Sequence, residues 1–197
     1  MADTQMSIPE HSHIHQTKIR FDYSDAYSHT VRARTIIDQV ALAFLNNTPQ
    51  WLVKLTVLKD KMVKSYQQKD RAEVEKSEER FKHYAMEEGE QVGHFTIIYK
   101  SDEEIIFARK DKSINVNISL MFLGKQDSGK SQKQLIMSTV MQVNNWWGKM
   151  TMVPLKPFHQ EMAPFVLENI AEEIANKQTN AISKKSKDDQ PNKPDDK

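Results

Sequence analysis

The feature that most constrains the fold is a run of short alternating segments between residues 93 and 144. In the clearest of them, 113–123 (SINVNISLMFL), every second residue is apolar. These apolar positions are Ile114, Val116, Ile118, Leu120 and Phe122. Such alternation is typical of an antiparallel strand with one covered face. Similar segments occupy 93–100, 103–109 and 133–144, separated by polar turns. We therefore expect an antiparallel meander whose apolar face must be covered by another element.

A long amphipathic segment after the strands can supply this cover. Between residues 152 and 177 the apolar residues recur at three- and four-residue spacing, which predicts a helix. They are Phe158, Met162, Phe165, Val166, Ile170 and Ile174. Pro164 lies inside this helix and should bend it.

Before the strand run, the sequence predicts one further strand and a pair of helices. Residues 18–31 alternate aromatic and polar positions, which suits a half-buried strand. Helical spacing follows over 36–45 and again over 49–66, where Thr48-Pro49 provides a helix start. The densely charged stretch 67–90 is expected to be an exposed insertion, either a helix extension or a lid.

The two ends of the chain differ from this patterned middle. The sequence has 197 residues, and those at 1–17 and 178–197 are predominantly polar. Such segments bury too little apolar surface to offset the entropy lost on ordering. We therefore predict a disordered N-terminal segment, one α+β domain at 18–177 and a disordered polar tail.

Charge and cysteine content exclude several classes of function. The 28 Lys+Arg and 27 Asp+Glu residues give a formal net charge of +1, whereas a nucleic-acid-binding face normally shows as a basic excess. A sequence without cysteine has no disulfide, thiolate zinc site or thiol nucleophile. No leader peptide or membrane span is recognisable, so we expect a cytoplasmic protein.

One motif suggests nucleotide binding but lacks the required context. GKQDSGKS at 124–131 matches the phosphate-binding pattern G-x-x-x-x-G-K-[ST], and NKPD at 192–195 imitates the guanine-reading N-K-x-D. A phosphate-binding loop needs a helix that begins at its Lys-Ser, yet the residues that follow are rich in β-branched side chains. We therefore interpret 124–131 as a polar hairpin loop and expect no cofactor.

Histidines and tryptophans are the remaining candidates for a site. The alternating histidines of HSHIH at 11–15 could share a face, but a metal site needs a geometry that a polar, unpatterned segment does not hold. Trp146 and Trp147 could line a pocket or act as core or surface anchors. His159 has no carboxylate of fixed geometry within a helical turn, and no nucleophile elbow occurs, so no catalytic residue or metal ligand is assigned.

Three stretches match one known pattern. They are TPQWLVKLTVLKDKMV, GHFTIIYKSDEEIIFARKDKSINVNISL and NNWWGKMTMVPLKPFHQ. The last is the most specific, with an Asn-x-x-Gly-Lys step that leads to Pro-Phe-His; its matching residues are Asn145, Gly148, Lys149, Pro157, Phe158 and His159. Together the stretches resemble a bacterial family, catalogued as a domain of unknown function, of the START-like or SRPBCC superfamily. The resemblance covers residues 20–176 and departs from the family pattern at 108–115.

The resemblance implies a helix-grip fold. In this arrangement a curved antiparallel sheet wraps around the long C-terminal helix, and a helix pair follows the first strand. Members of the superfamily bind lipids, sterols or polyketides. Similar domains occur beside NAD-dependent reductases, so analogy suggests a reductase acting in trans as a partner.

We therefore expect a module that binds a small apolar or amphipathic ligand between the sheet and the C-terminal helix. The candidate ligand-binding residues are Asn145, Trp147, Phe158, His159, Met162, Phe165, Val116 and Ile118. A cyclase- or hydrolase-type enzyme of the same fold would instead need His159 or Asn145 in a pocket beside a second polar group. A third hypothesis is a protein-interaction module that uses the charged stretch and the two ends, with a vestigial cavity.

Overall fold

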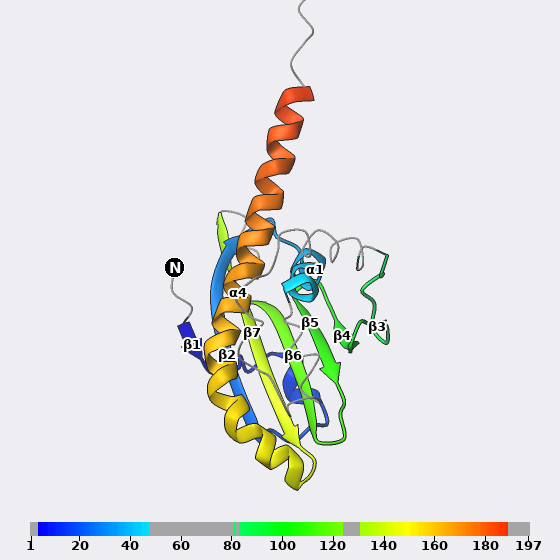
Figure 1. The fold of residues 1–197 in the computed structure, drawn as a ribbon. Helices are drawn as coiled ribbons and strands as arrows, with labels where there is room; N and C mark the ends of the chain where they lie inside the picture. The colour runs from blue at the N-terminus through cyan, green and yellow to red at the C-terminus, as the bar shows by residue number, and fades with distance from the viewer. Residues whose placement is uncertain (1–3, 48–80, 82, 124–130, 189–197) are drawn as a thin grey trace, which may run out of the picture.

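A computed structural model describes residues 4–47, 81, 83–123 and 131–188 (Figure 1). The described strands form one seven-stranded antiparallel sheet in the order β1-β2-β7-β6-β5-β4-β3. The strands are β1 (Thr4–Met6), β2 (Tyr23–Arg32), β3 (Gln91–Val92), β4 (Phe95–Lys100), β5 (Glu104–Arg109), β6 (Ile114–Leu123) and β7 (Gln132–Val143). The helices are the 3₁₀ helix η1 (His13–Gln16), α1 (Ile37–Asn47) and α4 (Trp146–Asp188).

The predicted α+β class, with a curved antiparallel sheet and a long C-terminal helix, is confirmed. Strands β4 to β7 form the expected meander, each paired with the next. The first long strand, β2, pairs with the last, β7, so that Tyr23 lies opposite Met141 and Arg32 lies opposite Gln132. The sheet has two short strands, β1 and β3, that the sequence did not predict.

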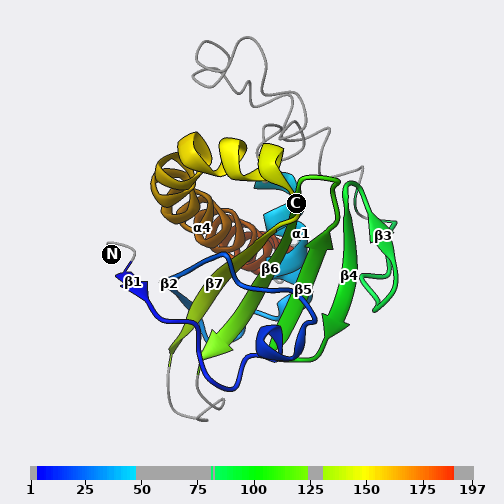
Figure 2. The ribbon, with the colours of Figure 1, turned by 90° about the horizontal axis from the view of Figure 1, so that it is seen from below.

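One face of the sheet is covered by α1 and α4 (Figure 2). The main core lies between this face and the two helices. Its fully buried members include Ile105, Phe107 and Leu120 from the sheet, Phe44 from α1, and Leu167 and Ile170 from α4. The alternation of apolar residues that predicted the strands therefore also identifies the face that packs against the helices.

Helix α4 begins at Trp146, earlier than the predicted residue 152. The Oδ1 of Asn145 accepts a hydrogen bond of 2.9 Å from the backbone N–H of Gly148, as an N-cap side chain does. A Cβ at position 148 would overlap the carbonyl oxygen of Ser113. A glycine is therefore required where the helix start approaches the β5–β6 turn.

The same helix continues beyond the predicted end at residue 177, and Figure 1 shows it extending past the sheet. It contains Pro154, Pro157 and Pro164. Each proline removes one helical N–H donor and crowds the preceding turn. Figure 2 shows that the helix changes direction along its first half, where these prolines lie.

The opposite face of the sheet is covered by the N-terminal segment, for which the sequence predicted disorder. Ile14 is fully buried against Ile106 and Val140. The carboxylate of Glu104 accepts hydrogen bonds from the Ser12 hydroxyl at 2.5 Å and the His13 backbone N–H at 2.8 Å. One buried apolar side chain and one buried carboxylate therefore hold a segment whose composition is polar.

Several predicted features lie outside the described residues. They are the second helix of the pair at 49–66, most of the charged stretch 67–90, and the loop 124–130. Strand β7 begins at Gln132, directly after the GKQDSGKS motif. The helix that a phosphate-binding loop requires is therefore replaced by a strand, as the sequence predicted.

Candidate functional site

One buried polar contact of α4 is made with β2. The Nε2 of His159 lies 3.2 Å from Oδ1 of Asp25, and the hydroxyl of Tyr23 donates a hydrogen bond of 2.5 Å to Oδ2. Because a carboxylate oxygen accepts hydrogen bonds, Nε2 is the protonated nitrogen in this pairing. The three side chains come from one strand face and one helix turn.

Burial dominates the electrostatics of this cluster. Asp25, His159 and Tyr23 are 6%, 4% and 8% exposed. Loss of hydration raises the pKa of Tyr23 well above its ordinary value, and the hydrogen bond to Asp25 and its charge raise it further. Loss of hydration on burial raises the pKa of Tyr27 as well. The cluster is closed to a substrate, and we interpret it as an anchor between helix and sheet.

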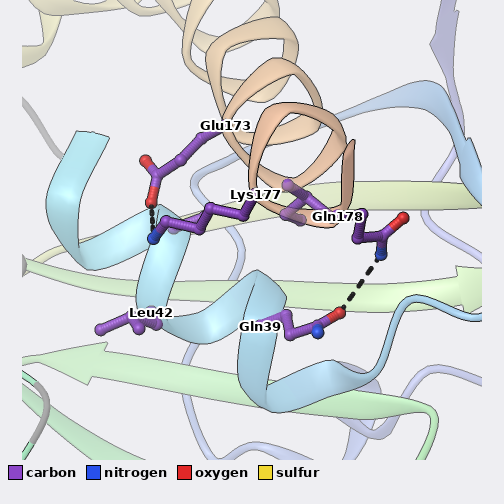
Figure 3. Close-up of a pocket in the computed structure, with 7 residues that line it drawn as sticks. Gln39, Leu42, Glu173, Lys177 and Gln178 are labelled. Carbon is purple, nitrogen blue, oxygen red and sulfur yellow. Dashed lines mark hydrogen bonds and ion pairs between the residues drawn. The ribbon is translucent and has the colours of Figure 1, made fainter. Parts of the chain in front are cut away.

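A further polar contact of α4 is made with α1, where the two helices line a partly open cavity of about 160 Å³ (Figure 3). The residues that line the cavity are Gln39, Leu42, Ala43, Glu173, Ile174, Lys177 and Gln178. Leu42, Ala43 and Ile174 make its middle apolar. The four polar side chains lie around them.

Hydrogen bonds connect the polar side chains around the cavity. The Nζ of Lys177 lies 2.7 Å from Oε1 of Glu173, and the amide of Gln178 donates to Oε1 of Gln39 at 3.5 Å. Figure 3 shows the two pairs on opposite sides of the cavity, with Leu42 on the side of the Glu173–Lys177 pair. The arrangement offers an ion pair and an amide pair on either side of an apolar surface.

Glu173 also connects the cavity to the end of α1. It accepts hydrogen bonds from the side-chain amides of Asn46 at 3.0 Å and Asn47 at 2.5 Å. The Oδ1 of Asn46 is buried and has no hydrogen-bond donor among the described residues. Asn46 lies one helical turn beyond Ala43, on the same side of α1.

The residues that the sequence proposed for a ligand site do not gather around this cavity. Val116 and Ile118 are each 2% exposed within the core between sheet and helix, and neither lines the cavity. Asn145 caps α4 at the surface. Trp147 and Phe165 are 64% and 51% exposed. Phe158 and Met162 are half-buried, and His159 bonds to Asp25.

The cavity residues escaped sequence analysis because a void leaves no periodic signal. Their spacing does place Gln39, Leu42 and Ala43 on one side of α1, and the same spacing unites residues 173–178 of α4. That spacing identifies two helix faces but not the gap between them.

The histidines of the N-terminal segment contact different partners. His13 stacks on Tyr99 with ring centroids 3.8 Å apart, and Nε2 of His15 lies 3.1 Å from the carbonyl oxygen of Pro9. Within the described ranges, no three metal-ligating side chains converge. None of the described helices combines the length and hydropathy of a membrane-crossing segment.

Comparison with known protein families gives a match to the family described as "Protein of unknown function (DUF2867)" over residues 19–165. The matched region runs from just before β2 into the first half of α4, and it includes the Asn145-to-His159 segment on which the resemblance mainly rests. The comparison with curated proteins gave no match.

Proposed function

The chain belongs to this family of proteins of unknown function, since the match covers most of its length, and we propose that it binds a small amphipathic molecule in the cavity between α1 and α4. The observation that carries the proposal is the cavity itself. The proposal places the expected ligand between two helices rather than between helix and sheet.

The size and apolar middle of the cavity support a small ligand. Its volume of about 160 Å³ resembles that of an engineered apolar cavity of about 150 Å³ that binds benzene. Leu42, Ala43 and Ile174 provide the apolar contacts. A ring or a short branched chain is therefore the class of apolar group that fits.

The polar rim supports a ligand that also carries a polar group. Glu173 and Lys177 offer both an acceptor and a donor, and the side chains of Gln39 and Gln178 offer both again. A hydroxyl or amino group on the ligand would have several partners at the opening.

The arrangement of elements is consistent with the helix-grip fold that the resemblance implies. A curved antiparallel sheet packs against a long C-terminal helix, and a helix follows the first long strand. We propose the START-like superfamily as the origin of this fold. In that superfamily the space beside the C-terminal helix holds the ligand, which supports a binding role for α4 here.

Filling the cavity tests the proposal. We expect phenol to bind the wild-type protein weakly in ligand-detected NMR, and Ala43→Leu to weaken this binding by about tenfold or more because the added side chain occupies the space. Ala175→Leu is the matched control, since it adds the same group on α4 outside the cavity lining. Its phenol affinity should equal that of the wild type.

Native mass spectrometry of the protein purified from cells provides the second readout. A bound molecule that is present in the wild type and lost in Ala43→Leu supports the proposal. A clean apo mass, together with equal phenol binding by the wild type and Ala43→Leu, contradicts it.

A further inference from the structure

The first turns of α4 expose four large apolar side chains in close succession. Trp146, Trp147, Met150 and Val153 are 60%, 64%, 55% and 75% exposed. We call these four residues the apolar tip. They lie at the lower end of the molecule in Figure 1, distant along α4 from the cavity. A contiguous exposed apolar surface of this kind marks an interaction site more often than scattered single residues do.

The apolar tip is one side of an amphipathic helix start. Trp146, Met150 and Val153 follow four- and three-residue spacing and therefore share a side of the helix. The opposite side carries Gly148 and Leu155, which are buried against the domain. The inner side thus anchors the helix, and the apolar outer side has no described covering element.

The tip is held in a fixed position by the rest of the fold. Its backbone approaches the β5–β6 turn so closely at Gly148 that a Cβ would overlap the Ser113 carbonyl. Asn145 caps the helix with its Oδ1 and donates through Nδ2 to the Lys112 carbonyl at 2.9 Å. The apolar side chains are therefore presented on a rigid platform.

Positive charge surrounds the tip. Lys149 is exposed on the same helical turns, and Lys110 and Lys112 are exposed in the adjoining β5–β6 turn. The Nζ of Lys156 instead lies over the ring of Tyr23, 5.7 Å from its centroid, and the nearby acid Asp22 pairs with Arg20 at 2.8 Å. The acid of the β5–β6 turn, Asp111, accepts the backbone N–H of Ser113 at 3.0 Å. Lysines thus outnumber acids around the apolar surface, although the whole chain is close to neutral.

Tryptophan and lysine together fit one kind of partner. Tryptophan side chains favour the headgroup level of a bilayer, and helices that lie in the interface combine such apolar side chains with lysines. Anionic lipids attract exposed lysines near the surface. A symmetric contact between two copies would instead bring together two surfaces that both carry an excess of lysines, which like-charge repulsion disfavours.

We propose that the apolar tip docks onto the surface of an anionic lipid bilayer. The tryptophans enter the headgroup region, and Lys110, Lys112 and Lys149 face the anionic headgroups. This role is independent of the cavity between α1 and α4, because no residue of the tip lines that cavity.

Vesicle flotation tests the apolar contribution. We expect the wild-type protein to float with phosphatidylcholine vesicles that contain roughly 30% phosphatidylserine. The variant Trp146→Ser/Trp147→Ser should lower the partition constant by about tenfold or more, because two apolar side chains lose their lipid contact. Phe165→Ser is the matched control: Phe165 is 51% exposed on the same helix but outside the tip, so partitioning should be unchanged.

Charge reversal tests the lipid class. The variant Lys110→Glu/Lys112→Glu, at two exposed positions of the β5–β6 turn, should lower partitioning onto the phosphatidylserine vesicles by about tenfold or more, and binding should weaken as salt is raised. Far-UV circular dichroism of each variant establishes that it is folded.

Three results would overturn the proposal. In the first, the wild-type protein does not bind the phosphatidylserine vesicles. In the second, Trp146→Ser/Trp147→Ser binds them as well as the wild type does. In the third, the wild type does not bind vesicles but forms a dimer, and the tryptophan substitutions dissociate that dimer. The last result would identify a second copy of the chain as the occupant of the tip.

Discussion

Two of the polar contacts that helix α4 makes with the rest of the domain, one with Asp25 of β2 and one with α1, are built differently. Against β2, two donors converge on the single carboxylate of Asp25, and the side chains leave little accessible surface. Against α1, the polar groups lie around the edge, and the short side chain of Ala43 leaves the middle open. The comparison indicates that convergence on one buried acceptor closes an interface, whereas polar pairs at a rim can leave room for a ligand.

Removal of the shared acceptor should have the largest effect. Asp25→Ala leaves the Tyr23 hydroxyl and the His159 ring without this buried partner, and each unsatisfied group costs about 1–3 kcal/mol. We expect the free energy of unfolding to fall by about 3 kcal/mol, measured by urea denaturation. Asp102→Ala, in the exposed β4–β5 turn, should change it by less than about 0.5 kcal/mol. Equal losses in the two variants would contradict an anchoring role for Asp25.

Tyr23→Phe should have an intermediate effect and should alter the pH dependence. Loss of the hydrogen bond to Asp25 should cost about 1.5 kcal/mol near neutral pH. Because the pKa of Tyr23 is raised in the folded state, the stability that its protonated form provides is complete below the unfolded-state pKa of about 10 and is lost as pH rises above it.

The alkaline loss of stability should therefore be smaller in Tyr23→Phe than in the wild type. Urea denaturation at about pH 8 and about pH 10.5 measures the difference. Some loss should remain, since the pKa of Tyr27 is raised as well. Tyr84→Phe, at a 36% exposed position, is the control and should follow the wild-type pH profile. If the free energy of unfolding fell equally between the two pH values in Tyr23→Phe and in the wild type, the alkaline loss could not be assigned to Tyr23.

The smallest loss is expected at the open contact. Glu173→Ala removes the acceptor for Asn46 and Asn47 and the partner of Lys177. Since the side chain of Glu173 is 13% exposed and water can approach its partners through the cavity opening, we expect a loss of about 1 kcal/mol in urea denaturation. The neighbouring exposed Glu172→Ala is the control. A loss as large as that of Asp25→Ala would show that both contacts are equally closed.

The sheet and the core side of α4 could be predicted from sequence because both depend on local periodicity. Alternation located the strands that became β4 to β7, and the three- and four-residue spacing after residue 152 located the buried side of α4. The start of α4 was missed because its first turns carry their apolar residues on the outer side, and Pro154 and Pro157 weaken the helical pattern.

The polar contacts could not be predicted because their partners are distant in the chain. Asp25 and His159 are separated by 134 positions, and Glu104 is 92 positions from Ser12. A turn of helix or a strand pair sets only the near neighbours of a residue. The N-terminal segment is ordered by its hydrogen bonds to Glu104 and by the burial of Ile14. Its polar composition gives no sign of these distant contacts and therefore predicted disorder.

The two shortest described strands of the sheet bear on how the protein avoids intermolecular strand pairing. Strand β1 has three residues and covers part of the outer edge of β2, which has ten; β3 has two and does the same for β4. A long uncovered edge is a template for aggregation between chains. The polar composition of the first 17 residues suggests that they could be removed. Their truncation would remove β1, leave the outer edge of β2 unpaired along its whole length and create a site for intermolecular strand addition.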